Sequence, residues 1–277
     1  MISPDPVRHP TAPIGGHRSG WSLARPVSHP QLVAAMDAAG IDRAVVVQAS
    51  TVYGHDNSYV VEAVRAHRGR LVGVYSVDVL AGDAVEKIAY WQAQGLFGFR
   101  LFTTGSTMPG QADWLADPAS FAAWAHAEAN AIPICLQMTM QGLPTLRMLL
   151  ERFPKIRVLL DHLARPDLSD GPPFAAARAL FDMAAYPGVY LKLTNRTLAT
   201  AAEGGADPAR FISAIVAAFG AGRIAWGSNF PAAEEPLPGL LAQARAALSG
   251  LPSEAQQMIF SGTAQTLYPA LATPAHV

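Results

Sequence analysis

Seven short runs rich in β-branched residues alternate with helical segments along this chain of 277 residues, and this alternation constrains the fold more than any other feature. The runs lie at 42–50, 71–78, 96–102, 132–138, 156–162, 189–194 and 223–229. The helical segments lie at 31–39, 56–67, 83–94, 118–130, 143–153, 173–186, 208–219 and 236–248, with a terminal helical pair from 253 onward. Strands that alternate with helices of about 10 to 15 residues predict βαβ units and a parallel sheet.

The number of units favours a barrel. Seven strands and eight main helices, beginning with a helix, come close to the eight of each in a TIM barrel. A doubly wound sheet usually needs fewer units, and no Gly-x-Gly-x-x-Gly follows a strand. We therefore predict an α/β fold, a single (β/α)8 TIM-barrel domain over residues 1–277 whose first strand is missing or truncated. Residues 1–30, rich in Pro and Gly, are expected to form an extended N-terminal loop.

Composition excludes several classes of protein. The chain is 51% hydrophobic and 15% charged, which allows a large core and argues against disorder. Its net charge of −1 provides no field for nucleic acid or an anionic membrane. Its one cysteine, Cys135, excludes a disulfide framework and a Cys-rich zinc site. No long apolar run and no secretory signal are visible, so we expect a cytoplasmic protein with a small-molecule partner. Whether the chain forms a homo-oligomer is left open by the sequence.

The ends of the predicted strands are unusually polar. In a TIM barrel the active site lies at the C-terminal ends of the strands. Polar groups at the ends of buried strands are costly unless they are paired or used. The polar residues at these ends are Gln48, Ser50, Asp78, Arg100, Gln137, His162, Lys192, Asn195, Arg196 and Asn229. We interpret them as the lining of a site.

Two of these residues have alternative interpretations. His162 suits a general base, a metal ligand or a group that polarises a carbonyl, but it also suits a hydrogen-bonded core histidine. Arg100 suits the binding of a carboxylate or phosphate, but it also suits a bridge to an acid on another strand. Lys192 is interpreted as polar lining. The remaining histidines that we considered lack ligand spacing and are expected to be mostly solvated: His17, His29, His55, His67, His126 and His276.

Six phrases, in their order and spacing, resemble the amidohydrolase superfamily, in the branch of TIM-barrel hydrolases that includes 2-pyrone-4,6-dicarboxylate lactonase. The phrases are GIDRAVVVQ at 40–48, YGHDN at 53–57, GFR at 98–100, DHLARPD at 161–167, WGSNFP at 226–231 and TAQTLY at 263–268. The resemblance covers essentially the whole chain from about Pro4. It implies a hydrolase that acts on a small carboxylated cyclic ester, or a related carbonyl compound, in the barrel mouth.

The resemblance also implies residue roles. His162 matches the histidine after strand six, which polarises a carbonyl or binds metal, and Arg100 matches a binder of substrate carboxylate. Arg165 matches a positively charged neighbour of the histidine, while Gln48 and Ser50 match the lining after strand two. We add Gln137, Lys192 and Asn195 as further substrate-binding candidates, and we take His162 and Asn229 as the catalytic candidates.

Two departures from the family pattern bear on the chemistry. Asn229 stands where strand eight usually ends in an aspartate, and an amide takes no proton at neutral pH. The His-x-His at the end of strand one is absent. A catalytic zinc needs about three protein ligands, so we expect no tightly bound metal unless an upstream His-x-His exists. Two alternatives remain open: a catalytically degenerate barrel that binds a small anion or a partner subunit, and a decarboxylase of the same superfamily.

The strand count leads to one further expectation. Seven strands leave two unpaired edges, and residues 1–30 have no β-branched run that would fill the gap. We expect that Met1 is not the native start and that a first strand precedes it. The alternative is that the first loop or a partner chain covers the two edges.

Overall fold

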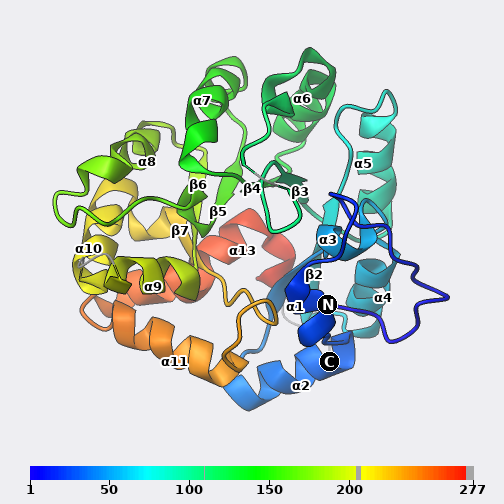
Figure 1. The fold of residues 1–277 in the computed structure, drawn as a ribbon, viewed down its shortest axis with the longest axis horizontal. Coiled ribbons are helices and arrows are strands. Elements are labelled where there is room, and N and C mark those ends of the chain that lie inside the picture. The colour runs from blue at the N-terminus through cyan, green and yellow to red at the C-terminus, as the bar shows by residue number, and fades with distance from the viewer. Residues whose placement is uncertain (109, 204–206, 273–277) are drawn as a thin grey trace.

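The computed structural model describes residues 1–108, 110–203 and 207–272, and a curled parallel sheet forms its centre (Figure 1). Each strand pairs with the next in chain order. The seven strands are β1 (Ala44–Val47), β2 (Leu71–Ser76), β3 (Phe99–Phe102), β4 (Ile134–Gln137), β5 (Val158–Asp161), β6 (Val189–Leu193) and β7 (Ile224–Trp226). The predicted α/β barrel and its number of strands are confirmed. The strands are shorter than their predicted runs: β3, β4 and β5 begin two or three residues later than predicted, and β1, β2 and β7 end before the polar residues that close their runs.

An outer ring of helices surrounds the strands (Figure 1). The helices close to their predicted positions are α2 (His29–Ala39), α4 (Ser58–Ala66), α5 (Ala84–Ala93), α6 (Phe121–Ala129), α7 (Leu143–Arg152), α10 (Pro208–Phe219) and α11 (Leu237–Leu248). Local sequence sets several of their ends. Ser28 and Gln31 form a capping box before α2, and Gly40 ends this helix at a φ of 66°. The Asp207 carboxylate accepts a hydrogen bond from the Ala209 N–H at the start of α10.

Some elements differ from the prediction. The single helix expected over 173–186 is α8 (Arg178–Asp182) between two 3₁₀ turns, because Phe174, at a φ of 62°, interrupts the helical backbone. Three helices were not predicted: α1 (Gly20–Ala24) within the expected loop, α3 (Ser50–Tyr53), and α9 (Asn195–Glu203) directly after β6. The terminal pair is α12 (Ser253–Gln257), a π turn and α13 (Thr263–Leu267).

The C-terminal segment fills one end of the barrel. Leu267, Tyr268 and Leu271 pack with Val72 and Cys135 inside it, and α13 lies at the centre of the ring (Figure 1). The Tyr268 hydroxyl lies 3.2 Å from the Cys135 sulfur. Tyr268 also stacks edge-on against Phe97, two residues before β3, so this segment packs against the amino ends of the strands. The carboxyl ends remain the place for a site.

Two further features concern the whole structure. In the parts of the chain that the structure describes, β1 and β7 each have one strand neighbour, so backbone hydrogen bonds do not close the barrel. None of the helices in these same parts is long and apolar enough to cross a membrane.

Candidate functional site

A buried carboxylate organises the carboxyl ends of the central strands. Asp161 ends β5 with a fully buried side chain. Its oxygens lie 2.8 Å from the Arg100 guanidinium and 3.1 Å from the Lys192 ammonium, from β3 and β6. Burial opposes ionisation of this carboxyl, but Lys192, Arg100 and His162 outweigh that effect and lower its pKa to about 2. Asp161 is therefore ionised at neutral pH.

Arg100 pairs with Asp161 on another strand, which is the contact that its alternative interpretation predicted. It also donates a hydrogen bond to the Gln137 side-chain oxygen, which places Gln137 beside the cluster. The Arg100 Nε is buried and has no hydrogen-bond partner among the residues that the structure describes. Sequence analysis did not select Asp161, although an acid directly before His162 at a strand end was the available signal.

His162 begins an unusual left-handed turn. The φ angles of His162, Leu163, Ala164 and Arg165 lie between 53° and 56°. This conformation costs roughly 1 to 2 kcal/mol per non-glycine residue. The Arg165 N–H donates to the His162 carbonyl at 2.9 Å, which closes the turn. Since a turn of this kind repeats about every three residues, His162 and Arg165 lie on the same side of it.

The imidazole of His162 is held and kept neutral. His162 is 5% exposed, and its Nδ1 lies 2.8 Å from the hydroxyl of Thr194, directly after β6. Burial is the largest cause that lowers its pKa, and Lys192, Arg100 and Arg196 add to it against the opposing effect of Asp161. The resulting pKa is about 3, so the ring carries no charge at neutral pH. Its Nε2 has no hydrogen-bond partner among the described residues.

Arg165 and Arg196 give the cluster an excess of positive charge. Burial, Arg196 and Arg100 all lower the pKa of Arg165. Its Nε is buried, and no hydrogen-bond partner for it lies within residues 1–108, 110–203 and 207–272. No acid pairs with either side chain within the part of the chain described. Four basic side chains thus accompany one carboxylate, a distribution that attracts an anion.

Three residues predicted to line the site instead form hydrogen bonds that hold loops, namely Gln48, Ser50 and Asn195. The Gln48 amide donates to the carbonyls of Gly54 and Asp56 at 3.1 and 2.8 Å, and its oxygen accepts from the Ser50 hydroxyl at 2.7 Å. Gln48 still lines the cavity described below. The Asn195 amide donates to the Leu240 carbonyl on α11 at 3.0 Å, so this side chain points away from the cluster.

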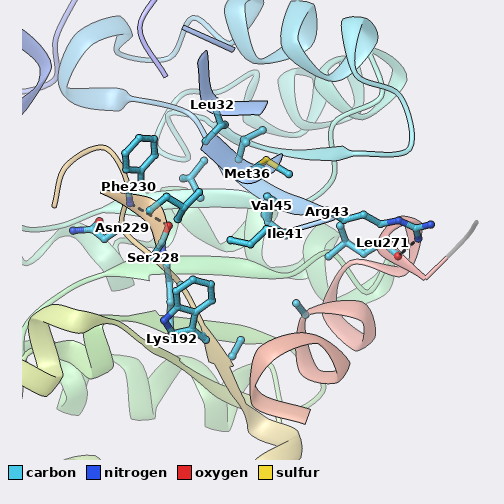
Figure 2. Close-up of a pocket in the computed structure, with 18 of the residues that line it drawn as sticks. Leu32, Met36, Ile41, Arg43, Val45, Lys192, Ser228, Asn229, Phe230 and Leu271 are labelled. Atoms are coloured by element: carbon cyan, nitrogen blue, oxygen red, sulfur yellow. Dashed lines mark hydrogen bonds between the residues drawn. The ribbon is translucent and has the colours of Figure 1, made fainter. Parts of the chain in front are cut away.

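Asn229 lies at the edge of a cavity of about 700 Å³ that reaches Arg100 and Lys192. It follows β7 with a φ of 56°, and its backbone carbonyl accepts from the Ala233 N–H at 2.9 Å. Figure 2 shows Asn229 beside Ser228 and Phe230, with Lys192 lining the same cavity.

Several histidines expected to be solvated make specific contacts instead. His29 Nδ1 and His67 Nε2 lie 2.9 Å apart, and Glu62 pairs with His29 at 3.5 Å. His9, which sequence analysis passed over, is buried and lies 3.2 Å from Glu62. This group ties the N-terminal segment to α4. His55 lies 2.9 Å from the Ser76 hydroxyl, while His276 is outside the described residues.

The residues around His162 do not fit a divalent metal ion. Over residues 1–108, 110–203 and 207–272, no group of three or more His, Cys, Asp or Glu side chains has the geometry to hold one. Asp161, the acid directly before His162, already pairs with two cations. Four basic side chains nearby would repel a further cation.

Comparison with known proteins shows the family of this chain. The family profile described as "Amidohydrolase" matches residues 20–270. An L-fucono-1,5-lactonase of Burkholderia ambifaria is 30% identical over 196 residues, which are 69% of this chain and 66% of that relative. The match therefore spans just under two thirds of the relative's length.

Solved structures share the fold. A zinc-bound amidohydrolase from Burkholderia multivorans has a TM-score of 0.74 at 23% identity, over 91% of this chain and 92% of that one. A probable 2-pyrone-4,6-dicarboxylic acid hydrolase from Acinetobacter baumannii, with citric acid bound, has a TM-score of 0.71 at 16% identity. That match covers 94% of this chain and 96% of the other.

Proposed function

We propose that this chain, which belongs to the amidohydrolase family, hydrolyses a small lactone that carries a carboxylate. The observation that carries the proposal is a neutral, buried His162 beside basic side chains that outnumber the acids. The similarity to an L-fucono-1,5-lactonase supports a lactone as the substrate class. The citric acid held by the Acinetobacter relative supports a carboxylated one.

Arg165 and Arg196 bind the substrate carboxylate in this proposal. Neither pairs with an acid among the described residues, whereas Arg100 and Lys192 are occupied in part by Asp161. A guanidinium offers two parallel N–H donors to a carboxylate, so Arg165 orients the substrate carboxylate as well as attracting it. The bound carboxylate fixes the ring so that the ester carbonyl faces His162.

The chemical step is the addition of water to that carbonyl. The water oxygen bonds to the carbonyl carbon, the bond from this carbon to the ring oxygen breaks, and the released oxygen takes a proton. Lys192 and Arg100 stabilise the negative charge that develops on the carbonyl oxygen. One lactone and one water molecule thus give one hydroxy acid.

His162 moves the proton. Its Nδ1–H donates to the Thr194 hydroxyl in this assignment, which leaves Nε2 to accept a proton from water and return it to the ring oxygen. The bound substrate carboxylate offsets the field of Arg100, Lys192 and Arg196. Burial is the largest cause that lowers the pKa of His162, and the field of these cations adds to it. Because the substrate carboxylate offsets the field, binding raises this pKa and makes the ring a better base.

The direct test is ring opening of a panel of small lactones, measured by proton release for the wild-type protein and for His162→Asn. We expect a loss of about 10²-fold or more in kcat for the variant. Unchanged turnover with a lower Tm would return His162 to the role of a core histidine.

Asn229 favours a second candidate function, an anion-binding barrel without turnover, because an amide cannot act as a general base. The variant Asn229→Asp separates the two. Activity that appears only in the variant would support the binding protein. Activity in the wild type that falls in the variant would support hydrolysis with Asn229 as a hydrogen-bonding group.

We also propose that the reaction needs no tightly bound divalent metal, on the basis of the positive surroundings of His162. Element analysis of the purified protein is the check. Zinc or manganese at one ion per chain would contradict this proposal.

A further inference from the structure

Residues 10–18, called the strap below, are fixed at both ends and exposed between them. Before the strap, His9 is buried and lies 3.2 Å from the Glu62 carboxylate on α4. After it, Ser19 is buried, and its hydroxyl lies 2.8 Å from that of Thr51 on α3. No residue of the strap itself is buried, and within the described part of the chain none of its apolar side chains packs into the core.

The strap spans the carboxyl end of β2. Its Ala12 and Ile14 N–H groups donate to the carbonyls of Val52 and Ser50 at 2.8 and 3.0 Å, so it lies beside α3, which follows β1 (Figure 1). The Ile14 carbonyl accepts a hydrogen bond at 2.9 Å from the hydroxyl of Thr107, in the loop after β3. Since β2 lies between β1 and β3 in the sheet, a segment held by both of these loops passes over the end of β2.

The contacts of the strap lead to the proposed site. Ser50, whose carbonyl holds Ile14, donates its hydroxyl to Gln48, which lines the cavity that reaches Arg100. Ser76, the last residue of β2, lies opposite Arg100 in the register of the sheet. The strap therefore covers the side of the barrel mouth that adjoins Arg100.

The strap is held weakly between its fixed ends. Segments with exposed backbone hydrogen bonds and few buried apolar contacts open at a small cost in free energy. Gly15 and Gly16 have φ angles of 87° and 80°. At Gly15 the strap approaches the loop after β3 so closely that a Cβ atom would lie 2.1 Å from the Thr107 carbonyl oxygen. At Gly16 a Cβ atom would meet none of the described residues within 4 Å.

We propose that the strap is a lid, which opens to admit the lactone and closes over it while His9 and Ser19 stay in place. The structure has the closed position. Closure excludes bulk water from this side of the mouth, which strengthens the attraction between Arg100 and the negative charge that develops on the carbonyl oxygen. The role of the lid in turnover rests on the proposed function, whereas its opening does not.

Gly15→Ala and Gly16→Ala test the lid as a matched pair. Each places a side chain at a φ that favours glycine, but only Gly15→Ala blocks the closed position. Hydrogen exchange of the Ala12 and Ile14 amides is measured residue by residue, with the buried Val52 of α3 as the reference. In the wild type we expect both amides to exchange about 10²-fold faster than that of Val52. In Gly15→Ala they should exchange about tenfold faster than in Gly16→Ala.

Kinetics connect the lid to turnover. With a carboxylated lactone, kcat/KM of Gly15→Ala should lie about tenfold or more below that of Gly16→Ala. If Gly15→Ala lowers the Tm or does not fold, Thr107→Val takes its place, because it removes the hydroxyl bonded to Ile14, and Thr107→Ser is then the control. Equal exchange in the paired variants, or equal kcat/KM despite different exchange, would overturn the lid.

A wild type that opens no lactone would contradict the proposed function, and citrate then decides whether the strap is a lid. Millimolar citrate should slow exchange of the Ala12 and Ile14 amides about tenfold in Gly16→Ala and leave it unchanged in Gly15→Ala. Unchanged exchange in both variants, or equal slowing in both, would overturn the lid as well.

Discussion

Asp161 determines how each basic side chain near His162 is used. It pairs with Arg100 and Lys192, so these two cations are partly neutralised, and Arg165 has no such partner among the described residues. Removing one partner of a buried ion pair leaves an uncompensated charge, whereas removing an unpaired cation does not. Replacing Arg165 should therefore affect substrate binding alone, whereas replacing Arg100 should also lower the stability of the fold.

Arg165→Met should raise KM for a carboxylated substrate about tenfold or more, which corresponds to roughly 1.4 kcal/mol, with little change in unfolding. Arg100→Met should lower kcat/KM at least as much and also reduce the free energy of unfolding by about 3 to 5 kcal/mol, because Asp161 loses a partner. Steady-state kinetics and urea unfolding of both variants provide the check. Equal stability losses would contradict the division of roles.

Thr194 is a positioning residue for His162. Thr194→Val keeps the shape of the side chain but removes the hydroxyl 2.8 Å from Nδ1. We expect kcat to fall about tenfold with KM nearly unchanged, since the ring loses its fixed orientation and not its substrate contacts. Thr194→Ser restores the hydroxyl and should recover most of kcat. A Ser variant as slow as the Val variant would show a packing role only.

At the scale of elements, the turn at 162–165 is the most strained feature of the site. Ala164 is buried at a φ of 56°, where glycine is favoured. Ala164→Gly should therefore leave the free energy of unfolding unchanged or raise it. Ala127→Gly, at an equally buried position inside α6, should lower it by about 1 kcal/mol. Thermal or urea unfolding compares them, and a larger loss at Ala164 would contradict the strain.

Element positions were largely predictable, but their contacts were not. Runs such as 156–162 predict strands because β-branched and apolar residues favour them wherever they occur. By contrast, α9 contains a single large apolar residue, Leu198, so no apolar run indicates a helix there. The left-handed turn after β5 has no glycine to indicate it. The ion pairs of Asp161 depend on three strands that are distant in sequence, and local patterns do not specify which cation an acid meets.

At the scale of the whole molecule, stability should depend on the neutral state of His162. The unfolded chain binds a proton at this residue near the ordinary histidine pKa of 6.5, whereas the folded pKa is about 3. The unfolded state thus binds more protons throughout this window, so stability falls as pH falls. Asp161, with its pKa lowered to about 2 from 3.8, adds a loss only at lower pH.

Urea unfolding at pH 7 and pH 4.5 tests this dependence. The wild type should lose roughly 2 to 3 kcal/mol more than His162→Asn between the two pH values. His126→Asn, on α6, is the matched control and should behave as the wild type. Identical losses in the wild type and His162→Asn would show that His162 titrates in the folded protein as it does in the unfolded chain.

The barrel itself was predictable because seven strands of similar length that alternate with helices leave few alternatives, but which strand-end residues meet could be seen only in the folded sheet. Gln48, Ser50 and Asn195 illustrate this limit, since each has a polar side chain at a strand end and each holds a loop. His162, Arg100, Gln137 and Lys192 do meet around Asp161, because their strands are neighbours or near neighbours in the sheet.

The central claim is that the cluster recognises a carboxylate on a lactone and opens the ring. The most direct measurement compares kcat/KM for a lactone with a free carboxylate and for the same lactone with that group converted to a primary amide. We expect the wild type to prefer the carboxylate at least tenfold and Arg165→Met to lose this preference. Equal kcat/KM for both lactones in the wild type, or no ring opening of either, would contradict the account.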